Sequence, residues 1–113
     1  MGTFTVGSVV LIPFPFSDLS KAKLRPALVV AETSYDDWIL CQITSQSYSD
    51  SKAIMITDDH FQQGSLQTIS YVRPSKLFTA NASLIIRQVG ELKPAVLKQV
   101  VEQITAILWH GVK

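Results

Sequence analysis

One segment near the N-terminus combines aromatic rings with positive charges. Phe14 and Phe16 are followed closely by Lys21, Lys23 and Arg25. Rings on which bases stack, next to cations that bind phosphate, are the side chains with which proteins hold single-stranded nucleic acid. The same composition also fits a loop whose rings tuck under a neighbouring sheet and whose lysines are merely solvated. Composition alone favours this second interpretation.

Arg25 stands between Leu24 and Pro26 at the start of an apolar run. At such a position a guanidinium can be held rigid and can offer a phosphate two parallel N–H donors. The alternative is an ordinary ion pair with Asp18 or Glu32, and spacing alone favours that pair. Arg25 is therefore a candidate phosphate ligand that needs support from other parts of the chain.

A polar stretch follows the apolar run 39–43. Thr44, Ser45 and Gln46 place two hydroxyls and an amide at the end of an expected strand. Such groups can bind phosphate or base edges, although Ser and Thr at strand ends more often satisfy the backbone of a turn. A second basic cluster, residues 73–76, is interpreted as a solvated turn.

Charge and ligand content limit the possible functions. Ten Lys+Arg against nine Asp+Glu give a net charge of +1, which excludes binding of a polyanion by bulk charge and leaves a local basic patch open. Cys41 with His60 and His110 is too small a set for a zinc site. Asp58 and Asp59 indicate helix capping and not a metal site or a glycosidase pair. We expect no metal and no cofactor.

The chain length predicts a single domain over residues 1–113, because 113 residues are fewer than the roughly 150 typical of one domain. The 47% apolar content is sufficient for a core. No run approaches the 18 or so apolar residues of a membrane span, and the N-terminus lacks the pattern of a signal peptide. We expect a cytoplasmic protein with no membrane association.

Short apolar runs separated by turn residues predict a series of β-strands. The runs are 9–12, 27–31, 38–43, 53–57, 70–73 and 84–89. Several are too apolar for simple alternation, which indicates burial on both faces, as in a small closed barrel. Residues 58–64 predict one capped helical turn ended by Gly64. The stretch from Pro13 to Pro26 would then be a long loop between the first two strands.

From Pro94 onward the apolar spacing becomes that of an amphipathic helix. Its apolar stripe consists of Leu97, Val100, Val101, Ile104 and Leu108. Pro94 suits the first turn and Gly111 the end, with Trp109 expected to pack at the helix end. The expected fold class is α+β, mainly β: a small antiparallel barrel with a C-terminal amphipathic helix.

Several short patterns follow one another along nearly the whole chain. They are Gly7-x-Val9-Val10, Pro13 to Phe16, Leu24-Arg25-Pro26-Ala27-Leu28-Val29-Val30, Ile43-Thr44-Ser45-Gln46 and Ser70-Tyr71-Val72-Arg73-Pro74-Ser75-Lys76-Leu77, with the terminal helix after them. An Arg-Pro that leads into a valine-rich strand, followed by an Ile-Thr-x-Gln strand end, is the characteristic combination. In this order the patterns resemble the PemK/MazF family of toxin endoribonucleases.

The resemblance implies an SH3-like barrel that forms a homodimer and cleaves single-stranded RNA without a metal. It also implies a cognate antitoxin whose tail fills the RNA groove, and binding of DNA by the toxin–antitoxin complex. The family's active-site arginine and threonine correspond to Arg25 and Thr44. The implied RNA-binding residues are Pro15, Phe16, Asp18, Ser20, Lys21, Lys23, Ser45, Gln46 and Ser70.

Two positions depart from the family pattern. Family loops are commonly rich in glycine, whereas this chain has no glycine between Ser8 and Gly64. Some members carry a basic residue where Ser70 stands here, so no third catalytic residue is assigned.

Two other functions fit the same barrel. One is a protein without catalytic activity that binds gyrase, as CcdB-type toxins do. The other is a module that binds nucleic acid without cutting it, which the near-neutral charge allows.

Overall fold

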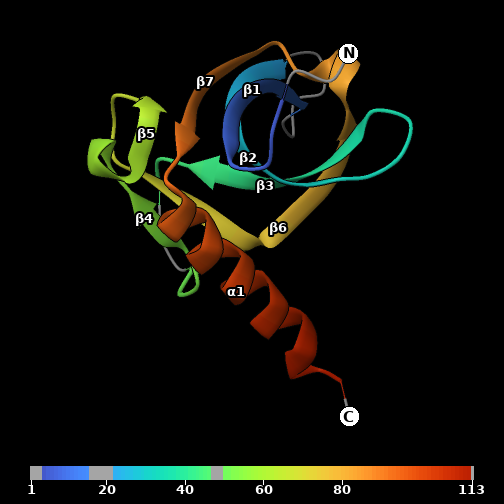
Figure 1. Cartoon of the computed structure of the whole chain (residues 1–113), viewed down its shortest axis with the longest axis vertical. Helices are drawn as coiled ribbons and strands as arrows, with labels where there is room; N and C mark the ends of the chain where they lie inside the picture. The colour runs from blue at the N-terminus through green and yellow to red at the C-terminus, as the bar shows by residue number, and fades with distance from the viewer. Residues whose placement is uncertain (1–3, 16–21, 47–49, 113) are drawn as a thin grey trace.

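The computed structural model describes residues 4–15, 22–46 and 50–112. Its strands form one antiparallel sheet in the order β4-β6-β3-β2-β1-β7-β5, which curls into a half-barrel with the helix α1 packed against it (Figure 1). The strands are β1 (Ser8–Pro15), β2 (Ala22–Glu32), β3 (Asp37–Thr44), β4 (Ile54–Ile56), β5 (Phe61–Gly64), β6 (Ser70–Asn81) and β7 (Arg87–Leu92). The helices are α1 (Pro94–His110) and the short 3-10 turns η1 (Asp58–His60) and η2 (Ala82–Leu84). The expected fold class, α+β and mainly β, is confirmed.

The central strands are buried on both faces because two apolar clusters pack on opposite sides of the sheet. The first cluster includes Val9, Leu28, Cys41, Ile43, Val72 and the helix residues Val96, Val100 and Ile104. The second includes Val10, Ile12, Ala27, Val29, Trp38, Leu40 and Ala80. Neighbouring residues of one strand therefore enter different clusters, which explains the nearly continuous apolar runs. Burial on both faces was predicted from these runs and is confirmed.

A long loop was expected from Pro13 to Pro26, and this prediction is wrong because both ends of the stretch are β-strand. β1 and β2 stay paired from Val9–Leu28 out to Pro15–Ala22, so much of this stretch is strand. Phe14 packs edge-on against Phe78 of β6 with 5.0 Å between ring centroids, and this contact stabilises the extended hairpin. Residues 16–21 lie outside the described residues.

β6 bends sharply in its middle (Figure 1). β3 pairs Cys41 with Leu77 and Ile43 with Val72, so residues 73–76 of β6 lie opposite the single residue Gln42. The buried Pro74 has no N–H to lose at this irregularity. The predicted strand over 70–73 therefore does not end there, and the expected solvated turn over 73–76 is a bend within a longer strand.

The segment 58–64 is helical over its first part. Thr57 caps η1 and donates its backbone N–H to Nδ1 of His60 at 2.8 Å. The predicted helical turn is shorter than expected, because Phe61 turns into the first cluster and starts β5. Gly64 ends β5 with φ of +75°, and a side chain there would collide with the carbonyl oxygen of Val89.

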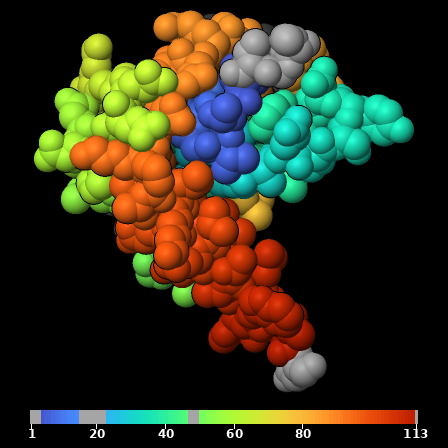
Figure 2. All heavy atoms as spheres, viewed as in Figure 1, coloured from blue at the N-terminus to red at the C-terminus, as the bar shows by residue number. Residues whose placement is uncertain are grey.

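The helix α1 begins at Pro94 and is capped by Gly111, as predicted. Its buried residues are Val96, Val100 and Ile104, with Leu97 packed beside them. Beyond Ile104 the helix projects away from the sheet (Figures 1 and 2). The predicted inward positions of Val101 and Leu108 are wrong, and Trp109 is 68% exposed and does not pack at the helix end.

Candidate functional site

β2 and β3 separate at Pro26. Their pairing stops at Ala27–Gln42, whereas β2 continues to pair with β1 out to Ala22. Proline has no backbone N–H, so Pro26 cannot donate the next hydrogen bond from β2 to β3. A cleft of about 630 Å³ occupies this place. Its walls are Lys23, Leu24, Arg25, Pro26, Ile43, Thr44, Ser45, Gln46, Leu66, Thr68 and Ser70.

The cleft brings together predicted site residues from three separate parts of the chain. These are Lys23, Arg25, Thr44, Ser45, Gln46 and Ser70. Pro15 ends β1 opposite Ala22, at the far end of the hairpin. The remaining predicted RNA-binding residues, Phe16, Asp18, Ser20 and Lys21, lie outside the described residues.

Arg25 and Thr44 line the cleft from different strands, Arg25 from β2 and Thr44 from β3. Each stands two residues beyond the last β2–β3 pair, Ala27–Gln42, where the pairing has stopped. Side chains two residues apart on a strand share one face, so both positions belong to the face of Ala27. Both side chains are half-buried. A cation and a hydroxyl placed in this way can bind the same phosphate group.

The side chain of Thr44 stabilises the turn that follows β3. The Thr44 hydroxyl oxygen accepts a hydrogen bond from the backbone N–H of Gln46 at 3.1 Å. This bond fixes the turn that exposes Ser45 and Gln46. Because a hydroxyl can accept and donate at once, Thr44 keeps its proton for donation to a ligand.

Ser70 is buried at the base of the cleft, with 2% of its surface exposed. Its hydroxyl donates to the carbonyl oxygen of Thr68 at 3.1 Å. It therefore holds the start of β6 to the segment before it. A side chain that is both buried and bonded contributes to the shape of the cleft.

Leu66 and Thr68 also line the cleft and were not predicted. They belong to the connection between β5 and β6, where the Ser65 hydroxyl accepts from the backbone N–H of Gln67 at 2.8 Å. Gln67 has a positive φ of 62°, which turns the chain back toward the cleft. No spacing or motif marks these residues, because long-range strand pairing decides where the connection lies.

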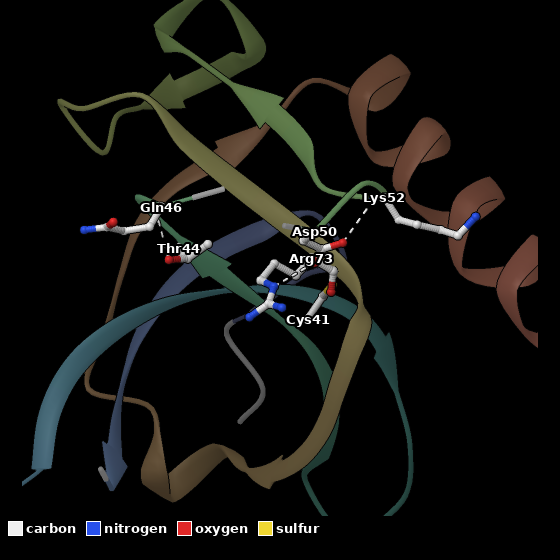
Figure 3. Close-up of polar contacts among 6 residues, drawn as sticks. All are labelled: Cys41, Thr44, Gln46, Asp50, Lys52 and Arg73. Carbon is white, nitrogen blue, oxygen red and sulfur yellow. Dashed lines mark hydrogen bonds and ion pairs between the residues drawn. The ribbon is translucent and has the colours of Figure 1, made fainter. Parts of the chain in front are cut away.

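An ion pair fastens Asp50, which precedes β4, to Arg73 of β6. Arg73 Nε lies 2.7 Å from Asp50 Oδ2, with the side chains 29% and 10% exposed (Figure 3). The hydrogen bond from Arg73 holds the pKa of Asp50 below its usual value. The second carboxylate oxygen accepts from the backbone N–H of Lys52 at 3.0 Å. Arg73 was expected in a solvated turn, whereas in the structure it lies in β6 and binds Asp50.

The thiol of Cys41 lies next to the same ion pair (Figure 3). It donates to the backbone carbonyl of Arg73 at 2.9 Å. Burial raises the pKa of Cys41 to about 12. At neutral pH this group is a protonated thiol, so it is not a nucleophile.

Two further features of the described residues bear on function. Residues 4–15, 22–46 and 50–112 contain no group of three or more His, Cys, Asp or Glu side chains that could hold a metal ion. Within this part of the chain no helix combines the length and the apolar character needed to cross a membrane.

The sequence matches the family described as PemK-like, MazF-like toxin of type II toxin-antitoxin system over residues 5–108. The chain belongs to this family. The resemblance carried by the Arg-Pro and Ile-Thr-x-Gln patterns is therefore confirmed, and the cleft of this MazF-like toxin contains both patterns. No curated protein matches the chain by sequence.

Solved structures share the fold of this chain. MazE-MazF (Form-II) from Deinococcus radiodurans has a TM-score of 0.74 and 18% identity, with 100% of both chains covered. An endoribonuclease in complex with its cognate antitoxin, from Mycobacterial species, has a TM-score of 0.69 and 15% identity, covering 96% of this chain and 95% of that one. A further endoribonuclease from Mycobacterial species has a TM-score of 0.70 and 17% identity, covering 96% and 93%.

The Asp50–Arg73 pair gives the toxin a pH-dependent stability that can be measured. The pKa of Asp50 is lower in the folded chain than in the unfolded chain, so the carboxylate stabilises the fold above its unfolded pKa. This contribution is lost as the pH falls through the lower folded value. We expect Asp50→Asn to cost about 1–2 kcal/mol at pH 7 and much less well below pH ~4.

Urea unfolding at several pH values measures this difference. The exposed Asp59 provides a matched control, and Asp59→Asn should change the free energy of unfolding by less than about 0.5 kcal/mol. An equal loss for Asp50→Asn at acidic and neutral pH would show that the ion pair is not its cause.

Proposed function

We propose that this toxin is an endoribonuclease that cleaves single-stranded RNA at the cleft between β2 and β3 without a metal ion. The observation that carries the proposal is that Arg25 of β2 and Thr44 of β3 line one cleft just beyond the point where the β2–β3 pairing stops. Proteins of the same fold that are described as endoribonucleases support the assignment of this activity.

The reaction that suits this pair is attack of the RNA 2′-OH on the adjacent phosphate. The 2′-oxygen forms a bond to phosphorus while the bond to the 5′-oxygen breaks, which gives a 2′,3′-cyclic phosphate and a 5′-OH end. This reaction requires loss of the 2′-OH proton, stabilisation of the extra negative charge on phosphorus, and a proton for the leaving oxygen.

Arg25 is suited to the second of these requirements. A guanidinium stays positively charged at neutral pH, so it stabilises charge well and gives up its proton poorly. The hydroxyl of Thr44 keeps its proton at neutral pH, so it cannot act as a free base. Its role is to donate a hydrogen bond that orients the phosphate or the 2′-OH. The proton of the 2′-OH therefore passes to a base outside this pair.

The other lining residues divide between backbone and base contacts. Lys23 is exposed at the rim and suits the RNA phosphates, and we assign the same role to Lys21. Ser45 and Gln46 are exposed and carry groups that both donate and accept, which is what recognition of base edges requires. We assign to them a part in sequence selectivity. We also propose that Pro15, Phe16, Asp18, Ser20 and the buried Ser70 complete the RNA-binding surface.

We further propose that the toxin acts in the cytoplasm as a homodimer and is inhibited by a cognate antitoxin. Similar structures are described as complexes with an antitoxin. The cleft between β2 and β3 of one chain is small, whereas two chains related by a two-fold axis would join two such clefts into one trough. The projecting end of α1 exposes Leu108, Trp109 and Val112, and a second copy could bury this apolar surface.

The first prediction from this function is RNA cleavage in the presence of EDTA. Purified protein incubated with mixed-sequence single-stranded RNA should cut it at an unchanged rate when chelator is added, leaving cyclic phosphate and 5′-OH ends. End-specific labelling and sequencing map these ends. Activity that disappears in EDTA and returns with magnesium would contradict the mechanism, and absence of cleavage would favour a binding protein.

The second prediction concerns the two candidate catalytic residues. Arg25→Ala and Thr44→Ala should each lower kcat by about 100- to 1000-fold, as removal of one preorganised donor does. Lys98 and Thr79 are exposed on other elements, and Lys98→Ala and Thr79→Ala are the matched controls. If a folded Arg25 or Thr44 variant cleaves as fast as these controls, the site assignment is wrong.

The third prediction concerns the shared trough. Sedimentation velocity should show a dimer at working concentrations. RNA and the antitoxin tail should compete for the same donors, so that added RNA weakens the apparent affinity for the antitoxin. A stable monomer, or a ternary complex of toxin, RNA and antitoxin tail at one groove, would contradict this arrangement.

A further inference from the structure

A row of paired residues leads from Thr44 on β3 across β6 to β4. Thr44 pairs with Tyr71 across β3 and β6, and Tyr71 pairs with Met55 across β6 and β4. Directly opposed residues share a face of the sheet, and neighbouring strands are about 4.8 Å apart. The residues Thr44, Tyr71 and Met55 therefore form one line across β3, β6 and β4, and Arg25 lines the same cleft as Thr44.

Tyr71 and Met55 face away from the first apolar cluster. Along β6, Val72 is buried in that cluster, whereas the neighbouring Tyr71 is half-buried and belongs to neither cluster. Along β4, Ile54 and Ile56 are buried and Met55 between them is 51% exposed. An aromatic ring and a thioether are thus presented side by side next to the candidate catalytic threonine.

The charges near this pair suit an anionic chain. Arg73 is two residues beyond Tyr71, and Lys76 acts on the same carboxylate, that of Asp50. Figure 3 shows Arg73 and Asp50 at the strand neighbouring that of Thr44. Two cations against one carboxylate leave this region positive. An RNA backbone that extends from Arg25 and Thr44 toward Tyr71 therefore meets no net electrostatic repulsion here.

We propose that Tyr71, with Met55 beside it, is a stacking platform for the nucleobase next to the scissile phosphate. This inference rests on the proposed endoribonuclease function. A ring one strand away from Thr44 lies where the base of a nucleotide adjoining the bound phosphate can reach it. Every base has an aromatic face, so the platform adds affinity for single-stranded RNA without selecting a sequence.

The stacking platform can be tested by measuring how tightly the protein binds an RNA analogue that it cannot cleave. The probe is mixed-sequence RNA carrying 2′-O-methyl groups at every nucleotide. Stacking on one aromatic ring corresponds to a loss of about tenfold in affinity when the ring is removed. We expect Tyr71→Ala and Tyr71→Leu to raise Kd by about this factor, whereas Tyr71→Phe binds like the unsubstituted chain. On cleavable RNA the same loss should appear in KM, with kcat changed less than about twofold.

Two controls distinguish stacking from a structural role. An abasic ribose-phosphate chain of the same length has no base to stack, so Tyr71→Ala should bind it as the unsubstituted chain does. Tyr35 is 92% exposed at the distant β2–β3 turn, and Tyr35→Ala should leave both affinities unchanged. Equal losses for Tyr71→Phe and Tyr71→Ala, or an equal loss on the abasic chain, would overturn the platform.

The same measurements separate this inference from the proposed function. If the unsubstituted protein cuts RNA and Tyr71→Ala and Tyr71→Leu bind it equally well, only the platform is wrong. If the unsubstituted protein neither cuts nor binds RNA, the proposed function is wrong and the platform is excluded with it.

Discussion

The missing backbone donor of Pro26 is the constraint on which the site depends. A sheet whose central strands are buried on both faces has little room for polar chemistry, because an unpaired polar group in either cluster is costly. Polar side chains can gather only where the ladder stops. Pro26 stops it between β2 and β3 while β1 continues to support β2, and the cleft follows from this difference. A barrel paired along its whole length would have no such opening.

The bend of β6 provides the second support of the site. Its register change carries Arg73 to a position where it binds Asp50 and where its carbonyl accepts from Cys41. Gln46 is thereby held by the Thr44–Gln46 hydrogen bond, and Asp50 is held to β6 by the ion pair. Part of the geometry at Thr44 is therefore held by residues that line no part of the cleft.

Local patterns predicted those features that depend on local physics. The doubly buried strands and the limits of α1 follow from apolar runs, Pro94 and Gly111, and the Arg-Pro and Ile-Thr-x-Gln patterns pointed to Arg25 and Thr44. Contacts distant in sequence decided the rest. The Phe14–Phe78 contact extends the first hairpin, strand pairing carries Leu66 to the cleft, and α1 leaves the sheet before Trp109 can pack. None of these is encoded in the spacing of neighbouring residues.

The half-barrel leaves two edge strands, and their length matters for the behaviour of the protein in a crowded cell. An unpaired strand edge can recruit strands of other chains and so begin aggregation. β4 spans Ile54–Ile56 and β5 spans Phe61–Gly64. Each edge is too short to pair with more than a few residues of an intruding chain. The short edges at β4 and β5 thus limit how much of an intruding strand the sheet can recruit at its two ends.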